Sequence, residues 1–324
     1  MLVTPAAQPG AAARPVALFV LGAPRSGTSA LTRVLSLCGA TLPVGMAGAD
    51  RNNLRGYWEP RAALHINNTI LHRHGSTVFD TSLRLQDDGG LDAEQKAACV
   101  GEIQAYLSTL PSAPLVVIKD PRITLLSGLW FEAARQAGFD VAVVIAVRHP
   151  REVIASGEAA LLAQPELASA LWLKFNLLAE RDSRGLPRVF VDYANFLDDW
   201  RREVKRISVA LDIDLDARDE GAIKDFLTSD LHRQRHSGPV TEPFGTDWIT
   251  VVNDALCAAA SDEPLDQAAL DHVFESYRAS ERGFRTALEN SHRLHKIHRF
   301  MPPRFLKLRN EIVALANRRS GTWA

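Results

Sequence analysis

The sequence has little cysteine and no long hydrophobic run. Three of its 324 residues are cysteines, Cys38, Cys99 and Cys257, and they stand far apart, without a CxxC pair or a Cys/His cluster. This spacing argues against a disulfide framework and a structural zinc site, and it favours a reducing, cytoplasmic setting. No apolar stretch reaches the roughly 18–20 residues that a membrane-spanning helix needs, which excludes an integral membrane protein. The first residues also lack the apolar core of a signal peptide.

Net charge is nearly absent as well. The formal charge is −1, from 37 Lys and Arg against 38 Asp and Glu. The charge is unevenly spread, because residues 292–319 hold eight Lys and Arg against the single acid Glu311. Such a basic end predicts either a peripheral contact with a membrane surface or an ordinary solvated helix face. Cations and aromatics do not alternate regularly there, so a nucleic-acid partner is not expected.

The sequence does contain an alternation of apolar and helical stretches. Strand-like apolar runs lie at 16–21, 115–120, 141–147 and 188–193, and helical patterns separate them. Fully apolar strands between helices are typical of a parallel sheet that is covered on both faces. We therefore predict an α/β fold with a doubly wound parallel sheet of four to five strands flanked by helices.

The same pattern predicts how the chain is organised. A flexible leader is expected over 1–15, an α/β domain over 16–240, and a mainly helical extension with a basic end over 241–324, packed on the same domain. Helices are expected at 27–38, 92–110, 123–137, 150–163, 167–184, 195–210 and 265–289.

A phosphate-binding loop follows the first predicted strand. Gly22–Ser29 reads GAPRSGTS and precedes a helix, so its backbone N–H groups and the positive helix end can hold one anion. The two glycines keep the spacing of nucleotide-triphosphatase loops, but Thr28 stands where those loops have lysine. The remaining cation of the loop is Arg25. This pattern favours a nucleotide with a single 5′-phosphate that carries a transferable group.

The PRSGTS run at 24–29 resembles the first signature of sulfotransferases that use 3′-phosphoadenosine 5′-phosphosulfate (PAPS). The resemblance implies a P-loop-like sulfotransferase fold and transfer of the sulfuryl group to an acceptor hydroxyl without a metal. The product would be 3′-phosphoadenosine 5′-phosphate (PAP). By the same resemblance, the 5′-phosphosulfate would be held by Arg25, Ser26, Gly27, Thr28 and Ser29.

A second signature of this family pairs an arginine at a strand end with a serine eight residues later. Arg148 and Ser156 have this spacing, and the resemblance implies that they hold the 3′-phosphate. The physical basis is sound, because ligands bind at the carboxyl ends of parallel strands and arginine binds phosphate bidentately.

Weaker matches extend the resemblance to residues 16–236. Lys119 belongs to a KDP turn that occurs in tyrosylprotein and bacterial sulfotransferases, where it would lie near the transferring sulfuryl group. Tyr193 would lie near the adenine, and Arg233 and Arg235 would belong to a late loop that covers the cofactor. The KGxxGDW-type motif of the cytosolic aryl and steroid enzymes is absent, so bacterial-type members are the better comparison.

The predicted catalytic residues are Glu59, Lys119 and Arg25. Glu59 stands in a GYWEP run that is similar to the GYWE or GYFE stretch of bacterial members, where a glutamate is the general base. The competing interpretation is that Glu59 only begins a helix near residue 61. Asp120 is the second candidate base and His65 the third.

Two other function classes remain open at this stage. One is a P-loop small-molecule kinase, and the other is a non-catalytic nucleotide-binding protein. Within the sulfotransferase reading, the acceptor is expected to contact segments 40–60, 75–90 and 237–262. Their polar residues favour a carbohydrate or glycolipid, while peptidyl tyrosine and a natural-product hydroxyl stay open.

Overall fold

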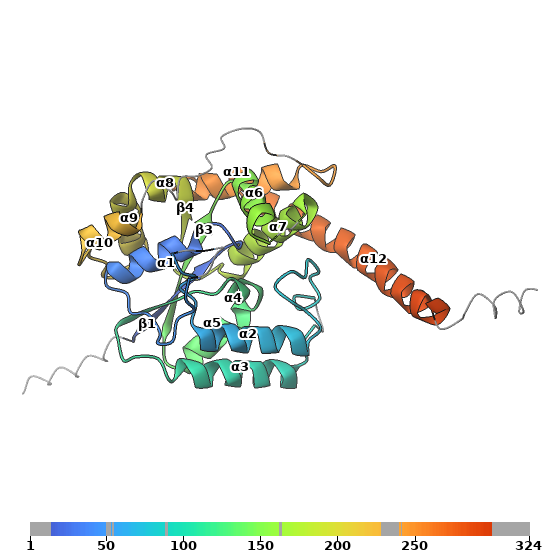
Figure 1. Ribbon diagram of the computed structural model, residues 1–324, viewed down its shortest axis with the longest axis horizontal. Coiled ribbons are helices and arrows are strands. Elements are labelled where there is room, and N and C mark those ends of the chain that lie inside the picture. The colour runs from blue at the N-terminus through green and yellow to red at the C-terminus, as the bar shows by residue number, and fades with distance from the viewer. Residues whose placement is uncertain are drawn as a thin grey trace, which may run out of the picture. The chain divides into compact units, whose positions relative to one another are not determined.

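The computed structural model describes residues 14–49, 53, 55–87, 90–161, 164–227, 240 and 242–299. Its centre is a sheet of four parallel strands: β1 (Val16–Leu21), β2 (Leu115–Ile118), β3 (Asp140–Val147) and β4 (Arg188–Asp192). The strand order is β2-β1-β3-β4, and Figure 1 labels β1, β3 and β4. This confirms the predicted α/β fold with a parallel sheet, at the lower end of the expected strand number.

The strands are buried on both faces. In register, Val16 of β1 pairs with Leu115 of β2 on one side and with Asp140 of β3 on the other. All four residues of β2 and the last seven of β3 are buried. Continuous apolar runs suit this position, because each successive side chain points to the opposite face and meets a helix there.

One face of the sheet is covered by helices from the beginning and the middle of the chain. Leu18, Val20 and Val144 pack there with buried residues of α1 (Thr28–Leu37) and α9 (Trp200–Leu211). The short helices α8 (Tyr193–Asp198) and α10 (Glu220–Phe226) contribute to the same core cluster.

The other face is covered by α4 (Pro121–Leu125), α5 (Ser127–Gln136) and α7 (Pro165–Asp182), which contact the sheet through β1 or β3. Phe19 of β1 makes edge-to-face contacts with Trp130 at 6.1 Å and Phe131 at 5.4 Å. Helices α2 (Arg61–Arg73) and α3 (Ala93–Leu107) lie side by side (Figure 1), and α6 (Pro150–Leu161) packs on α7.

Two predicted helices were wrong, because each is divided by a turn. The stretch predicted at 123–137 forms α4 and α5, and the backbone leaves the helical conformation at Leu126 (φ −125°, ψ 19°). The stretch at 195–210 forms α8 and α9, with Asp199 as the N-cap of α9. Asp199 accepts a hydrogen bond from the backbone N–H of Arg202, so its side chain favours a new helix start over a continuous helix.

By its internal contacts the chain divides into a unit that ends at Phe274 and a second unit that begins at Glu275. Helix α11 (Trp248–Ala260), which lies beyond the domain boundary expected near residue 240, packs against β4 and α7. Helix α12 (Gln267–Arg299) begins in the first unit. Within the described ranges, every helix is too short or too polar to cross a membrane.

Candidate functional site

Each strand of the sheet is followed, at its carboxyl end, by one predicted site residue. Lys119, Arg148 and Tyr193 directly follow β2, β3 and β4, and Arg25 lies four residues beyond β1. The chain passes from β1 to β2 on one side and then crosses to β3 on the other, so the two directions of winding meet at β1 and β3. In doubly wound sheets, ligands bind at this switch point.

The loop after β1 is bent by three residues with positive φ angles. Gly22, Arg25 and Gly27 have φ values of 133°, 73° and 87°. The backbone N–H of Ser26 donates to the carbonyl of Ala23 at 3.1 Å, which closes the turn. A non-glycine residue such as Arg25 rarely adopts this conformation, and such strained backbone is common where a loop binds a ligand.

Two glycines of the loop also allow close packing. A Cβ atom on Gly27 would lie 2.1 Å from the Tyr193 ring, and one on Gly22 would lie 2.7 Å from the carbonyl oxygen of Ala146. The loop therefore rests directly on the Tyr193 side chain, and the position of Tyr193 near an adenine stays a prediction.

Two features of the loop would suit a bound anion. Helix α1 begins at Thr28 with Gly27 as its N-cap and has no side-chain capping hydrogen bond, so the N–H groups of its first turn can receive an anion. The hydroxyl of Ser26 is fully buried and has no hydrogen-bond partner among the described residues. A buried polar atom without a partner costs free energy, and a bound phosphate oxygen would satisfy it.

The second predicted signature is assembled beside the loop. Arg148 donates from Nη1 to the carbonyl of Arg25 at 2.9 Å, and its guanidinium lies 4.7 Å from the centre of the Tyr193 ring. Ser156 accepts a hydrogen bond from Arg25 Nε at 3.0 Å, so the serine contacts the loop arginine. Burial raises the pKa of Tyr193, and the cations Arg148 and Arg25 oppose that shift.

The ammonium of Lys119 connects the loop to the candidate base. Lys119 is only 2% exposed, and Nζ donates to Ser29 Oγ at 3.0 Å, to the carbonyl of Tyr57 at 2.8 Å and to Glu59 Oε1 at 2.7 Å. The three N–H groups of the ammonium are thus all used. Thr28 occupies the usual lysine position, and β2 supplies a cation to the loop instead.

Glu59 is buried and held in a rigid segment. Its carbonyl accepts from the backbone N–H of Ala47 at 2.6 Å, and Trp58 before it has a φ of 55°. Helix α2 begins at Arg61 with Pro60 as its N-cap, while the Glu59 carboxylate forms an ion pair with Lys119. The contacts of Glu59 therefore favour a role in the site over that of a helix cap.

The two other candidate bases lie in different surroundings. Asp120 is fully buried and caps α4, and its oxygens accept from Asn67 at 2.8 Å and from the Arg122 guanidinium at 2.8 Å. His65 is exposed on α2. Arg233 and Arg235 lie outside the described residues.

Sequence reasoning missed an aromatic and cationic cluster next to Glu59. The Arg33 guanidinium lies 4.5 Å from the Trp58 ring centre, and Trp58 makes an edge-to-face contact with Phe226 at 6.3 Å. Arg55 stacks on Phe226 at 5.7 Å and donates to its carbonyl. This cluster joins the segment before α2 to the end of α10, and no periodic signal in the sequence connects these positions.

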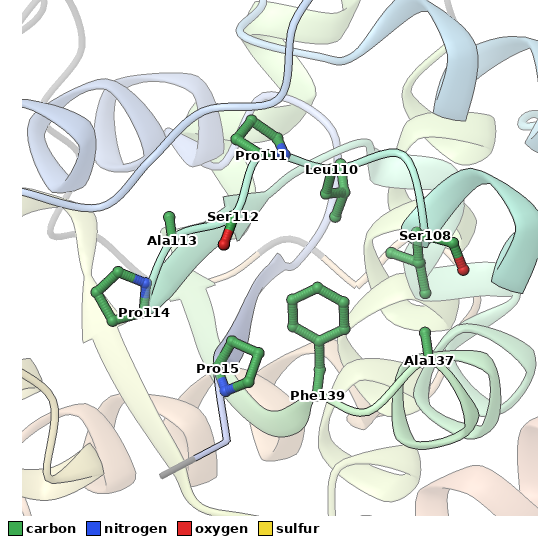
Figure 2. A pocket seen from close by; sticks show the side chains of 10 residues that line it. Pro15, Ser108, Leu110, Pro111, Ser112, Ala113, Pro114, Ala137 and Phe139 are labelled. Atoms are coloured by element: carbon green, nitrogen blue, oxygen red, sulfur yellow. The ribbon is translucent and has the colours of Figure 1, made fainter. Parts of the chain in front are cut away.

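Two further features of the described residues are relevant to the site. No group of three or more His, Cys, Asp or Glu side chains is placed to hold a metal ion within the described ranges. A pocket of about 410 Å³ lies at the opposite end of the sheet (Figure 2). Pro15, Pro114 and Phe139, which precede β1, β2 and β3, line it, and its lining has no ionisable side chain. It is therefore separate from the phosphate loop.

No protein-family model and no curated protein matches the chain. Solved structures that are similar to it include two sulfotransferase domains. The sulfotransferase domain from the Synechococcus PCC 7002 olefin synthase has 21% identity and a TM-score of 0.41, covering 85% of this chain and 98% of that one. The sulfotransferase domain from the curacin biosynthetic pathway has 16% identity and a TM-score of 0.43, covering 78% and 99%.

Proposed function

We propose that the protein is a sulfotransferase that moves the sulfuryl group from PAPS to an acceptor hydroxyl. The observation that carries the proposal is the position of Lys119, whose ammonium bridges Ser29 of the phosphate loop and the carboxylate of Glu59. One cation thus lies between an anion cradle and a buried carboxylate. Transfer of a sulfuryl group needs these three elements together: a cradle, a cation and a base.

Each site residue has its own role in the proposed reaction. The loop N–H groups and the Ser26 hydroxyl bind the 5′-phosphate, and Arg148 binds the 3′-phosphate of the nucleotide. Glu59 accepts the proton of the acceptor hydroxyl as the new O–S bond forms. The S–O bond to the phosphate breaks, and its electron pair stays on PAP, where Lys119 and Arg25 stabilise the added negative charge.

Lys119 has to exchange a hydrogen bond during this reaction. Its three N–H groups are used by Ser29, Tyr57 and Glu59. Ser29 is the partner that lies in the loop, so an oxygen of the sulfuryl group or of the leaving phosphate would replace its hydroxyl most directly. This exchange keeps the carbonyl of Tyr57 and Glu59 as anchors for the ammonium.

Two features disfavour the kinase alternative. The loop has Thr28 where lysine reaches the β- and γ-phosphates of a triphosphate. Asp120, the acid next to Lys119, has its oxygens occupied by Asn67 and Arg122, so it is poorly placed to hold Mg²⁺. A non-catalytic nucleotide-binding protein would have no need for the buried pair of Lys119 and Glu59.

Thermal unfolding with added nucleotide tests the proposal. PAP without metal at 100 times its Kd adds about 2.7 kcal/mol to the free energy of unfolding, which gives a clear rise in Tm. ATP with Mg²⁺ at the same concentration is expected to have a much smaller effect. The reverse order would overturn the proposal in favour of a kinase. Release of PAP that depends on an added acceptor separates the enzyme from a non-catalytic binder.

For the acceptor we propose a polyhydroxylated molecule, a carbohydrate or glycolipid. The support is the polar composition of the segments 40–60 and 75–90, which lie before and after α2, and the first of which contains Glu59. Peripheral membrane contact through 292–319 is part of the same proposal, and most of that segment lies outside the described residues. Transfer of labelled sulfate to a panel of oligosaccharides, glycolipids and tyrosine peptides decides between these acceptors.

A further inference from the structure

Arg148 has a buried partner on the next helix that the proposed reaction does not yet use. Glu152 lies in the first turn of α6 and is 7% exposed, and its Oε2 accepts from Arg148 Nε at 2.8 Å. The two side chains form an i,i+4 ion pair that is largely shielded from water. A buried carboxylate beside an expected phosphate site needs a reason, because it repels the anion.

The contacts of Arg148 suggest that reason. A guanidinium has five N–H donors, on Nε, Nη1 and Nη2. Glu152 takes the Nε donor, the carbonyl of Arg25 takes one donor of Nη1, and the Tyr193 ring supports the guanidinium plane. With the Nε edge engaged, a phosphate that binds two donors at once has to approach the edge formed by Nη1 and Nη2.

The charge of Glu152 also affects the pKa values of two neighbouring groups, Asp192 and Tyr193. Burial raises the pKa of Asp192 at the end of β4, and the Glu152 carboxylate adds to that shift. Glu152 acts in the same direction on Tyr193. The charged groups that act on Tyr193 are thus Arg148, Glu152, Arg25 and Arg55. Of these, Glu152 forms an ion pair with Arg148 within the part of the chain that the structure describes.

We propose that Glu152 is a positioning residue that orients Arg148 for the 3′-phosphate and offsets part of its charge. The proposal rests on the proposed function. Glu152 is expected to have two opposite effects. Its hydrogen bond to Nε fixes the direction of the guanidinium, which raises selectivity for 3′-phosphorylated nucleotides. Its negative charge weakens the binding of the 3′-phosphate. Neither effect acts on the binding of AMP, because AMP has no 3′-phosphate.

The test is the selectivity ratio, the Kd of AMP divided by the Kd of PAP, measured by calorimetry. Glu152→Gln keeps an oxygen acceptor for Nε and removes the charge, so the ratio is expected to rise about threefold to tenfold. Glu152→Ala removes both, so its ratio is expected to lie about tenfold below that of Glu152→Gln. Glu158→Gln, an exposed acid on the same helix, is the matched control and leaves the ratio unchanged.

Each outcome has a separate meaning. Equal ratios for Glu152→Gln and Glu152→Ala would overturn the orienting role, and a Glu152→Gln ratio equal to that of the wild type would overturn the charge effect. The second comparison stands even where Glu152→Ala fails to fold. Arg148→Ala tests the proposed function: it should lower the ratio strongly, and an unchanged ratio would show that the 3′-phosphate is not bound by Arg148. In that case the Glu152 proposal falls with the assignment of Arg148.

Discussion

Lys119 and Glu59 are 60 positions apart in the sequence, and their side chains form an ion pair of 2.7 Å with exposures of only 2% and 8%. Lys119 arrives from the end of β2, and Glu59 from the segment before α2. The same ammonium contacts Ser29 of the phosphate loop at 3.0 Å. The candidate base and the anion cradle therefore share one cation, and the first two predictions test this arrangement.

Glu59→Gln should remove the base and keep nucleotide binding. Turnover is expected to fall about 10²–10⁴-fold, because the amide cannot accept the proton of the acceptor hydroxyl. The Kd of PAP should change little, since the amide oxygen can still accept from Lys119. Steady-state sulfate transfer and calorimetry measure the two quantities. His65→Ala, at an exposed position on α2, is the control and should keep full turnover. Unchanged turnover in Glu59→Gln would show that a residue other than Glu59 is the base.

Lys119→Met should lower stability as well as activity. The substitution leaves the Glu59 carboxylate buried without its cation, which costs about 3–5 kcal/mol. Adding Glu59→Gln to Lys119→Met should restore part of this loss, because the buried charge is then gone. Urea unfolding of the two single variants and the double variant measures the coupling. Strictly additive effects on the free energy of unfolding would mean that the ion pair does not form in solution.

Gly27→Ala should disrupt the contact between the loop and Tyr193. Gly138 is a matched control, because its φ of 88° nearly equals the 87° of Gly27, and an added Cβ at Gly138 meets no atom within 4 Å. Gly138→Ala is expected to cost about 1–2 kcal/mol from backbone strain alone. Gly27→Ala should cost about 1–3 kcal/mol more, from overlap with the ring. Adding Tyr193→Ala to Gly27→Ala should relieve this excess, because the smaller side chain leaves room for the new Cβ atom. Equal losses in the free energy of unfolding for Gly27→Ala and Gly138→Ala would contradict the packing of Gly27 on Tyr193.

Asp182 should make stability depend on pH. Ser127 Oγ lies 2.5 Å from its carboxylate, and burial raises the pKa of Asp182 while Ser127 and Arg181 oppose the shift. A raised pKa in the folded state contributes stability that is full below the unfolded pKa of about 3.9 and is lost as the pH rises through the folded value. Asp182→Asn, which stays neutral, should therefore gain stability relative to the wild type as the pH rises.

Thermal unfolding at pH 4.5 and pH 7.5 measures this difference. The Tm of Asp182→Asn minus that of the wild type should be larger at pH 7.5, by on the order of 2–4 °C. Ser127→Ala removes a hydrogen bond that opposes the shift, so it should strengthen the pH dependence of the wild-type aspartate. A Tm difference that is the same at both pH values would show that the pKa of Asp182 is ordinary.

The sequence predicted the parts of the site that follow from local patterns. The apolar runs gave the parallel strands, and the Gly22–Ser29 spacing gave the loop and the start of α1. The predicted site residues Arg25, Lys119, Arg148 and Tyr193 meet because parallel strands bring their carboxyl ends to one edge of the sheet. Glu152 was within reach of the same reasoning, since its i,i+4 spacing from Arg148 on a predicted helix allows an ion pair.

Contacts between distant segments were beyond the sequence. The pattern assigned Ser156 and Arg148 to the same phosphate, which stays a prediction, and it gave no sign that the Ser156 hydroxyl accepts from Arg25. The hydrogen bonds that the Asp120 carboxylate, the second candidate base, accepts from Asn67 and Arg122 were likewise not predicted. The contact of Arg55 with Phe226 joins residues that are 171 positions apart. Such contacts depend on how helices pack on the sheet, which periodicity does not specify.

The sequence by itself therefore determined the α/β architecture and the position of the loop after β1, because strand burial and loop conformation depend on residues that are near one another in the chain. The tertiary structure alone decided which side chains bond across the site. It joined Lys119 to Glu59 and Ser29, left the Ser26 hydroxyl without a partner among the described residues, and placed Tyr193 against Gly27. The physical reason is that a side-chain bond needs atoms within about 3 Å, and only the packing of distant segments sets such distances.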